Sequence, residues 1–453
     1  MNGIEQYNGT MEVPAGNRTP YWAAAAVFVT LVGWGIYMYS RQFAQGLGVT
    51  GLNRPVFWGL YIANFIFCVG LSAGGIAVSA LVHLLDKKEM KPVAIMSEIL
   101  AASLLILAAS FIVMDLGRPL YMFNLFLHPN IESPLLWDVS VISCYMILCL
   151  ALLYFSARQQ LLRRLQDHPS LRPLIELATL GHTSLSPRAL EWDHRCLNVL
   201  AIISVPAAVA LHSVTAWILG LVKGQPGWNT SILAPLFIAS ALVSGFAMVM
   251  LAVIVARRLF RFPVGEDVVR MLARYLIVAI LVLMYLIFSE FLTVGYSGTV
   301  PHLAVFNELL FGRFSKIFWF DAIVGLLIPL LLLGLPRSNR SIFSIGLASL
   351  LVVVGVFAER TYLLLPSLMR PNAFTGTFPA YAPTTLEWSL MAGVYSLGCL
   401  LFLAGMGLVF GIPPRRARAE AQQAAELAGL QLARTGPAQH QYYLGAETAR
   451  PPG

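Results

Sequence analysis

The sequence is poor in charge. Only 11% of its 453 residues are Asp, Glu, Lys or Arg, against roughly 25% in an average soluble domain, whereas 58% are hydrophobic. This composition excludes an ordinary soluble globular class and is typical of a polytopic α-helical membrane protein. Residues 1–20 also lack the basic-then-apolar order of a cleavable signal peptide, so the first apolar segment is expected to remain as a span.

Cysteine and histidine are scarce where a redox metal would need them. Five cysteines form no Cys-x-x-Cys pair, and their spacing excludes four-cysteine ligation of an iron–sulfur cluster. Only His83 and His212 lie in apolar stretches, near opposite faces, so no bis-histidine haem is expected. The sequence therefore predicts no metal, haem or iron–sulfur cluster in this chain, and any electron carrier would belong to another subunit.

Ten long apolar stretches are present, each close to the ~20 residues that a helix needs to cross a bilayer. They predict an all-α integral membrane protein with a cytoplasmic N-terminal tail at 1–20, a membrane domain at 21–411, and a cytoplasmic, partly disordered tail at 412–453. The predicted spans are 21–40, 56–85, 93–114, 135–156, 197–222, 231–256, 271–293, 317–335, 341–360 and 386–411.

Basic residues are distributed unequally between the two sides of this arrangement. The side that carries both tails has 22 Lys and Arg residues, and the other side has 8. By the positive-inside rule the tails are expected to be cytoplasmic, in a multi-pass protein of the bacterial cytoplasmic (inner) membrane. The net charge of +8 then serves to anchor the protein at the bilayer surface, and no nucleic-acid partner is expected. Tryptophans 58, 137, 217, 228 and 388 are expected to form an interfacial aromatic belt.

Ionisable residues within spans mark functional sites by default, because each costs about 2.5–3.5 kcal/mol on insertion scales. Glu98 and His83 are the only two expected near the cytoplasmic ends. The others lie toward the outer face: Asp115, Arg118, Asp138, His212, Glu290, Asp321, Glu359, Arg360 and Glu387.

Structural explanations exist for several of these residues. Asp115 with Arg118, and Glu359 with Arg360 at the end of the ninth span, could be ion pairs that fasten helix ends. His212 could be a core histidine bonded to a carbonyl freed by Pro206. The number of such groups on one side favours proton or electron chemistry there.

The run Asp115-Leu116-Gly117-Arg118-Pro119 resembles the signature of the NrfD/PsrC family, the membrane subunits of polysulfide reductase-like complexes. The resemblance extends over residues ~20–411, and the order of the motifs is specific. The further matching segments are Gly70-Leu71-Ser72-Ala73-Gly74-Gly75, Ser133-Pro134 before Trp137, His212-Ser213-Val214, Pro226-Gly227-Trp228, Ala234-Pro235, Ser244-Gly245, Glu290, Glu359-Arg360 and Pro383-Thr384 before Glu387.

The resemblance implies two four-helix bundles, spans 2–5 and 6–9, with spans 1 and 10 added as in the longer branch of the family. That branch includes DsrP, HybB and the alternative complex III subunits. The last of these carry a His where Ser72 stands and an Asp where Trp217-Ile218 stand. The chain is therefore more similar to the DsrP and HybB types.

The resemblance also implies a function. Family members bind a quinone or quinol, menaquinone or ubiquinone, in the first bundle near the outer face. A periplasmic ferredoxin-like iron–sulfur subunit docks over it, and a multihaem cytochrome c and further membrane or catalytic subunits complete some complexes. The chain would be a quinone-reactive subunit of an oxidoreductase, with or without proton translocation, and not an enzyme alone.

The predicted quinone site lies between spans 2, 3, 4 and 5. It is flanked by Ser72, Asp115, Arg118, Asp138 and His212, with Asp115 and His212 as the proton acceptors. Two other classes remain open: a secondary transporter, and a non-catalytic membrane anchor of a redox complex. A proton path is predicted to use His83, Glu98, Glu290, Glu359, Arg360 and Glu387.

Overall fold

The computed structural model describes residues 19–84, 90–260, 262, 264–335, 341–370 and 379–411. Apart from residues 19 and 20, the two predicted tails lie outside these ranges. Within them the chain forms helices and no strands. Ten of these helical segments are long and apolar enough to cross a membrane, which confirms the predicted all-α membrane class.

Nine of the ten spans are single helices. They are α1 (Thr19–Gln45), α2 (Leu60–Leu84), α3 (Lys91–Asp115), α5 (Pro134–Asp167), α7 (Pro187–Gly220), α8 (Leu233–Phe260), α9 (Glu266–Ser297), α13 (Ile342–Leu368) and α14 (Thr385–Val409). The remaining span consists of α11 (Ser315–Trp319), the π-helix η5 (Phe320–Leu327) and α12 (Ile328–Gly334). Short helices in the connections are η1 (Leu47–Val49), η3 (Pro119–Phe123), α4 (Asn124–Leu127), η4 (Pro169–Leu171), α6 (Arg172–Ala178) and α10 (Val300–Leu310).

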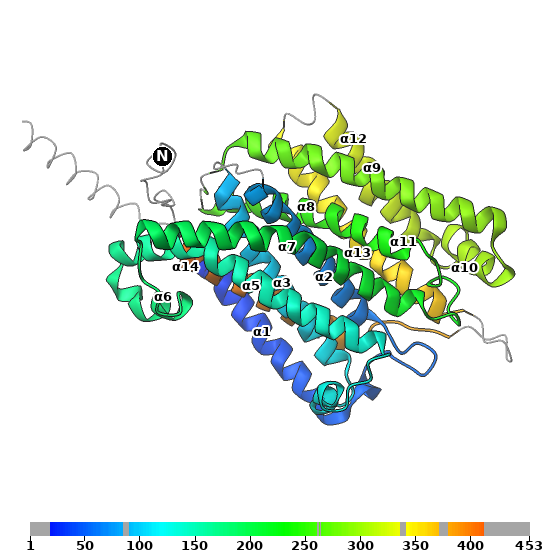
Figure 1. The fold of residues 1–453 in the computed structure, drawn as a ribbon. Helices are drawn as coiled ribbons and strands as arrows, with labels where there is room; N and C mark the ends of the chain where they lie inside the picture. The colour runs from blue at the N-terminus through cyan, green and yellow to red at the C-terminus, as the bar shows by residue number, and fades with distance from the viewer. Residues whose placement is uncertain are drawn as a thin grey trace, which may run out of the picture.

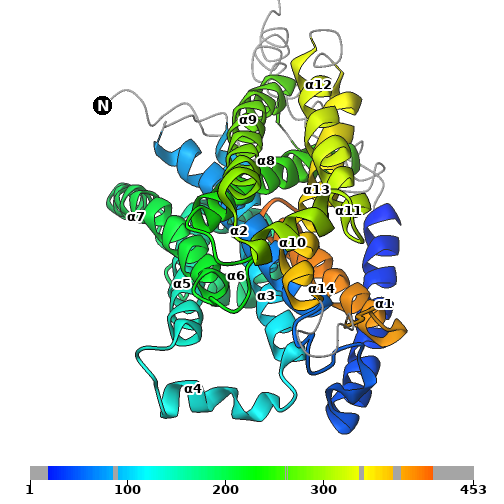
Figure 2. The same ribbon diagram turned by 90° about the vertical axis from the view of Figure 1, so that its right-hand side faces the viewer.

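The helices form two bundles around α2, which Figure 2 shows near the middle of the molecule. Helices α2, α3, α5 and α7 pack in one ring, and α8, α9, α13 and the α11–η5–α12 span pack in another. The bundles meet mainly where α2 packs against α8. Helices α1 and α14 pair with each other, and α14 packs against α3 (Figure 1). This is the predicted arrangement of two bundles and two added helices.

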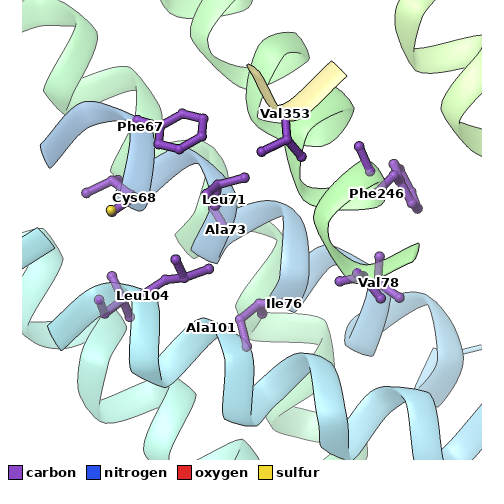
Figure 3. Close-up of a cluster of buried hydrophobic side chains, with 14 of the residues drawn as sticks. Phe67, Cys68, Leu71, Ala73, Ile76, Val78, Ala101, Leu104, Phe246 and Val353 are labelled. Carbon is purple, nitrogen blue, oxygen red and sulfur yellow. The ribbon is translucent and has the colours of Figure 1, made fainter. Parts of the chain in front are cut away.

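Helix α2 is the axis of the core because it is apolar on nearly all sides. Figure 3 shows its side chains among those of its neighbours: Ile76 lies toward Ala101 of α3, and Val78 toward Phe246 of α8. Phe67 contacts Phe357 of α13 with ring centroids 5.4 Å apart. Helix α2 therefore belongs to the first bundle and also packs against the second.

The α2–α8 joint depends on a close approach of two glycines. A Cβ added to Gly74 would collide with the carbonyl oxygen of Ala241 and the backbone of Gly245. Gly74→Ala is expected to destabilise the protein by about 1–3 kcal/mol, because the backbones would have to separate. A lowered thermal unfolding midpoint in mild detergent would show this.

The neighbouring glycine provides the matched control. A Cβ at Gly75 would lie 3.4 Å from the Ser97 carbonyl oxygen and 3.6 Å from the Ala101 Cβ, which its surroundings accommodate with little or no shift. Gly75→Ala should therefore unfold within a degree or two of the wild type. Equal destabilisation by both variants would contradict the close-approach explanation.

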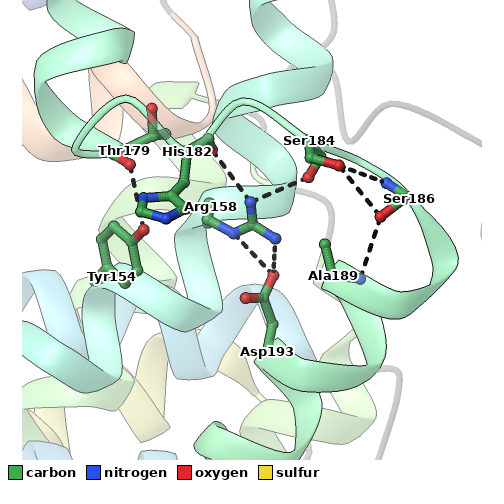
Figure 4. A network of polar contacts seen from close by, with 8 residues as sticks. All are labelled: Tyr154, Arg158, Thr179, His182, Ser184, Ser186, Ala189 and Asp193. Atoms are coloured by element: carbon green, nitrogen blue, oxygen red, sulfur yellow. Dashed lines mark hydrogen bonds and ion pairs between the residues drawn. The ribbon is translucent and has the colours of Figure 1, made fainter.

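Arg158 of α5 holds the connection between α5 and α7 in place (Figure 4). Its side chain is 4% exposed, and its Nε lies 2.9 Å from Asp193 Oδ2. Its Nη1 donates to the carbonyl oxygens of His182 and Ser184, each at 3.1 Å. Because the guanidinium and the carboxylate neutralise each other and the arginine donates further to carbonyls, this pair satisfies the conditions for a buried ion pair.

Candidate functional site

His212 of α7 is buried, with 3% of its surface exposed. Its Nδ1 lies 3.0 Å from the carbonyl oxygen of Ala208, so Nδ1 must carry the hydrogen of the neutral imidazole. The alternative explanation of a bond to a carbonyl freed by Pro206 does not hold, because that carbonyl would be the one of residue 202. The remaining nitrogen, Nε2, is then a hydrogen-bond acceptor. It is buried and has no hydrogen-bond partner among the described residues.

Asp138 of α5 lies close to this face of α7. Its Oδ1 accepts a hydrogen bond of 2.6 Å from the hydroxyl of Thr215. Thr215 is three residues after His212, so the two side chains share one helix face. The structure thus brings the predicted residues Asp138 and His212 to the same buried face between α5 and α7. The sequence analysis missed Thr215, which the three-residue spacing could have indicated.

Ser72 of α2 is fully buried, and its hydroxyl donates to the carbonyl oxygen of Ala101 at 3.0 Å. The contact ties α2 to α3. Ser72 is therefore available to a ligand only as a hydrogen-bond acceptor while this bond is kept.

The structural explanation of Asp115 and Arg118 as an ion pair does not hold: the ion pairs of the described residues do not include this one. The chain leaves the helix at Leu116 in an extended conformation, and Arg118 is exposed. Asp115 is instead close enough to Glu387 for electrostatic interaction. One of its oxygens, Oδ1, is buried with no partner in the described structure.

Glu387 acts as a capping residue at the start of α14. Its carboxylate accepts hydrogen bonds from the Thr384 and Gly51 amides, each at 2.8 Å, and from the Tyr381 hydroxyl at 2.7 Å. Burial raises the pKa of the Tyr381 phenol, so it stays protonated and keeps donating. Glu387 thus connects the loop before α2 to the start of α14 through hydrogen bonds. The sequence analysis predicted a proton path for Glu387 and did not predict this structural role.

Glu359 and Arg360 do not close a span as predicted, because α13 continues to Leu368. They form a buried pair with a 3.7 Å separation between Glu359 Oε1 and Arg360 Nη1. The Ser240 hydroxyl donates to Glu359, and the Arg360 guanidinium lies 4.6 Å from the Phe237 ring centroid. None of the three guanidinium nitrogens has a hydrogen-bond partner among the described residues.

The Arg360 side chain faces the first bundle. A Cβ built on Gly70 of α2 would lie 3.7 Å from Arg360 Nη2, and the guanidinium is within electrostatic range of the His212 imidazole. A guanidinium from the second bundle therefore lies within electrostatic range of the His212 imidazole of the first. Sequence spacing gave no sign of this, because the residues are far apart in the chain. We call His212, Asp138, Thr215, Arg360 and Glu359 the central polar group.

Glu98 near the start of α3 and His83 at the end of α2, the two residues predicted to lie toward the cytoplasm, are in contact. His83 Nε2 lies 3.2 Å from Glu98 Oε1, and Glu98 is fully buried. The hydroxyls of Ser79 and Ser156 also donate to this carboxylate. Both serines were missed by the sequence analysis.

Glu290 of α9, another of the predicted acids, lies in the second bundle. Its Oε2 accepts a 2.9 Å hydrogen bond from Thr230, and the residue lines a pocket there.

Trp228 is 1% exposed, so its predicted place in an interfacial aromatic belt is wrong. Its indole N–H donates to the Leu363 carbonyl, and its ring stacks on Trp58 with centroids 5.9 Å apart.

Fold and site together define a multi-pass, all-α membrane protein with buried acid, base and cation side chains between two bundles. The described residues contain no group of three or more side chains suited to a metal ion. Residues 48–372 match the family described as "Polysulphide reductase, NrfD". The match covers more than half of the chain, so the chain belongs to the NrfD family.

Relatives of similar length share this resemblance. The chain is 30% identical to a putative dimethyl sulfoxide reductase membrane subunit of Halobacterium salinarum, over 89% of this chain and 94% of that protein. It is 29% identical to a selenate reductase subunit of Mesobacillus selenatarsenatis, over 84% and 92%. It is 26% identical to the Hdr-like menaquinol oxidoreductase integral membrane subunit of Archaeoglobus fulgidus, over 88% and 96%.

Proposed function

We propose that this chain is the quinone-reactive membrane subunit of a multi-subunit redox complex in the bacterial cytoplasmic membrane, with both tails cytoplasmic. It exchanges electrons between menaquinone or ubiquinone and an outer iron–sulfur subunit. The observation that carries the proposal is the buried, unpartnered Nε2 of His212 among the described residues. Family membership and a relative named as a menaquinol oxidoreductase subunit support it.

The residues suit quinol oxidation, which releases two protons and two electrons. His212 Nε2 is oriented as an acceptor and can take a proton from a ring hydroxyl. The N–H groups of Arg360 have no hydrogen-bond partner among the described residues, and these can stabilise the oxyanion left behind. The electrons pass to the iron–sulfur centres of the partner, and a multihaem cytochrome c is a further acceptor in such an assembly.

The outer residues of the predicted site complete the proposal. Ser72, Asp115, Arg118 and Asp138 flank the ring between α2, α3, α5 and α7. Asp115 lies at the outer end of α3 with one buried, unpartnered oxygen among the described atoms, and it passes protons to the outer surface.

A proton path to the cytoplasm forms a separate part of the proposal. The His83–Glu98 pair, with Ser79 and Ser156, is a hydrogen-bonded polar group at the cytoplasmic end of the first bundle. It would supply or take up protons there. Glu290, Glu359, Arg360 and Glu387 are the corresponding candidates toward the outer face.

A quinol titration of the intact complex tests the proposal. The complex is purified in mild detergent, and reduction of the partner's iron–sulfur centres is followed by their electron paramagnetic resonance as quinol is added. We expect saturable, quinol-dependent reduction. A transporter or a non-catalytic anchor would give no dependence on quinol, and that result would overturn the proposal.

A further inference from the structure

The second bundle contains a pocket at the end where α8 begins and α9 ends. It lies between α8, α9, α10 and α13. It shares Glu359 with the central polar group, whereas none of the five residues predicted to flank the quinone lines it. Its position in the second bundle indicates a second site.

Two helices turn matching faces to this pocket. Helix α10 contributes residues 302, 305, 306 and 309, and α9 contributes 287, 290, 291 and 294, both with the spacing of one helix face. Each face carries three apolar residues and one ionisable residue, His302 or Glu290. Phe291 and Phe306 meet across the gap with centroids 4.9 Å apart. The lining is mostly apolar and aromatic, with a few polar groups, as a ring-bearing ligand requires.

The polar groups of the pocket are mainly hydrogen-bond acceptors. Ser367 is 1% exposed, and its hydroxyl has no hydrogen-bond partner among the described residues. It faces Gly227, where a Cβ would collide with it. The carboxyl groups of Glu290 and Glu359 also line the pocket, whereas the described lining contains no lysine or arginine. A ligand with hydroxyl donors fits this lining, and an anionic phosphate head group does not.

We propose that this pocket binds the ring of a quinol, with its hydroxyls donating to Glu290 and Ser367 and its ring against the aromatic wall. The inference rests on the proposed reactivity toward the quinone pool, but it assigns a second binding site distinct from that of His212. Binding alone is proposed for this pocket.

Photolabelling of the intact complex tests this proposal. A short-tailed quinol that carries a diazirine is added anaerobically to the complex in lipid nanodiscs, irradiated, and the labelled peptides are mapped by mass spectrometry. We expect labelling within residues 299–311 or 359–368 that excess unlabelled quinol suppresses and excess phosphatidylglycerol does not. Leu309→Trp fills the pocket from α10 and should lower this labelling at least tenfold. Labelling of α7, which carries His212 of the first proposed site, should persist.

Leu303→Trp is the matched control, because residue 303 is on the same helix but does not line the pocket. It should leave the labelling unchanged. Absence of label in these segments, label that quinol does not suppress, or displacement by the phospholipid would each overturn the inference. Pocket labelling without quinol-dependent turnover would instead refute the proposed function and leave the second site standing.

Discussion

Replacement of His212 by alanine is expected to lower quinol-linked turnover of the complex by about 10²–10⁴-fold, which is the usual contribution of a positioned general base. The only hydrogen bond of the imidazole among the described residues is to the carbonyl of Ala208 in its own helix, so the variant should still assemble. Initial rates of partner reduction at saturating quinol, divided by the amount of assembled complex, measure the effect.

A matched histidine and a second acceptor sharpen this test. His194→Ala removes an exposed imidazole from the other end of α7 and should leave turnover unchanged. Asp115→Asn should also lower turnover, because an amide cannot take up a proton as the buried carboxylate can. Wild-type turnover in both His212→Ala and Asp115→Asn would remove these residues from the mechanism.

The fold could be predicted from the sequence because apolar runs of membrane-spanning length leave few alternatives. Each of the ten predicted spans overlaps an observed one, and the largest differences are at the end of α5, the start of α7 and the end of α13. α5 and α7 are 34 residues each, about 51 Å at 1.5 Å per residue, so both extend beyond the apolar part. Their extensions are held by Arg158 and Asp193, a contact that hydropathy cannot reveal.

The side chains of the site could be named from the sequence, but their partners could not. Asp115 and Arg118 are three residues apart and would pair on a helix, yet α3 ends between them and their side chains separate. Arg360 and His212 come from different bundles, so the position of the guanidinium near the imidazole depends on how α13 packs against α2. Only tertiary packing determines such pairings.

Replacement of Glu359 by leucine is expected to destabilise the protein by about 3–5 kcal/mol, because it would leave Arg360 buried without its ion-pair partner. Asp321 is also within electrostatic range of Arg360, which should keep the cost toward the lower end. The yield of assembled complex and its thermal unfolding midpoint should both fall. Asp193→Ala is the matched control, because it removes the ion-pair partner of Arg158, which is not part of the central polar group. This variant should reduce stability without changing turnover per assembled complex.

The double variant Glu359→Leu/Arg360→Met distinguishes the effect of the ion pair on stability from the effect of Arg360 on turnover. Removal of both charges leaves no buried ion to desolvate, so assembly should recover most of what Glu359→Leu loses. Turnover should stay at least tenfold below the wild type, because no cation would then face His212 to stabilise the developing oxyanion. Recovery of both assembly and turnover would show that Arg360 only balances Glu359. A double variant as unstable as the single one would show that the unpaired guanidinium does not cause the loss.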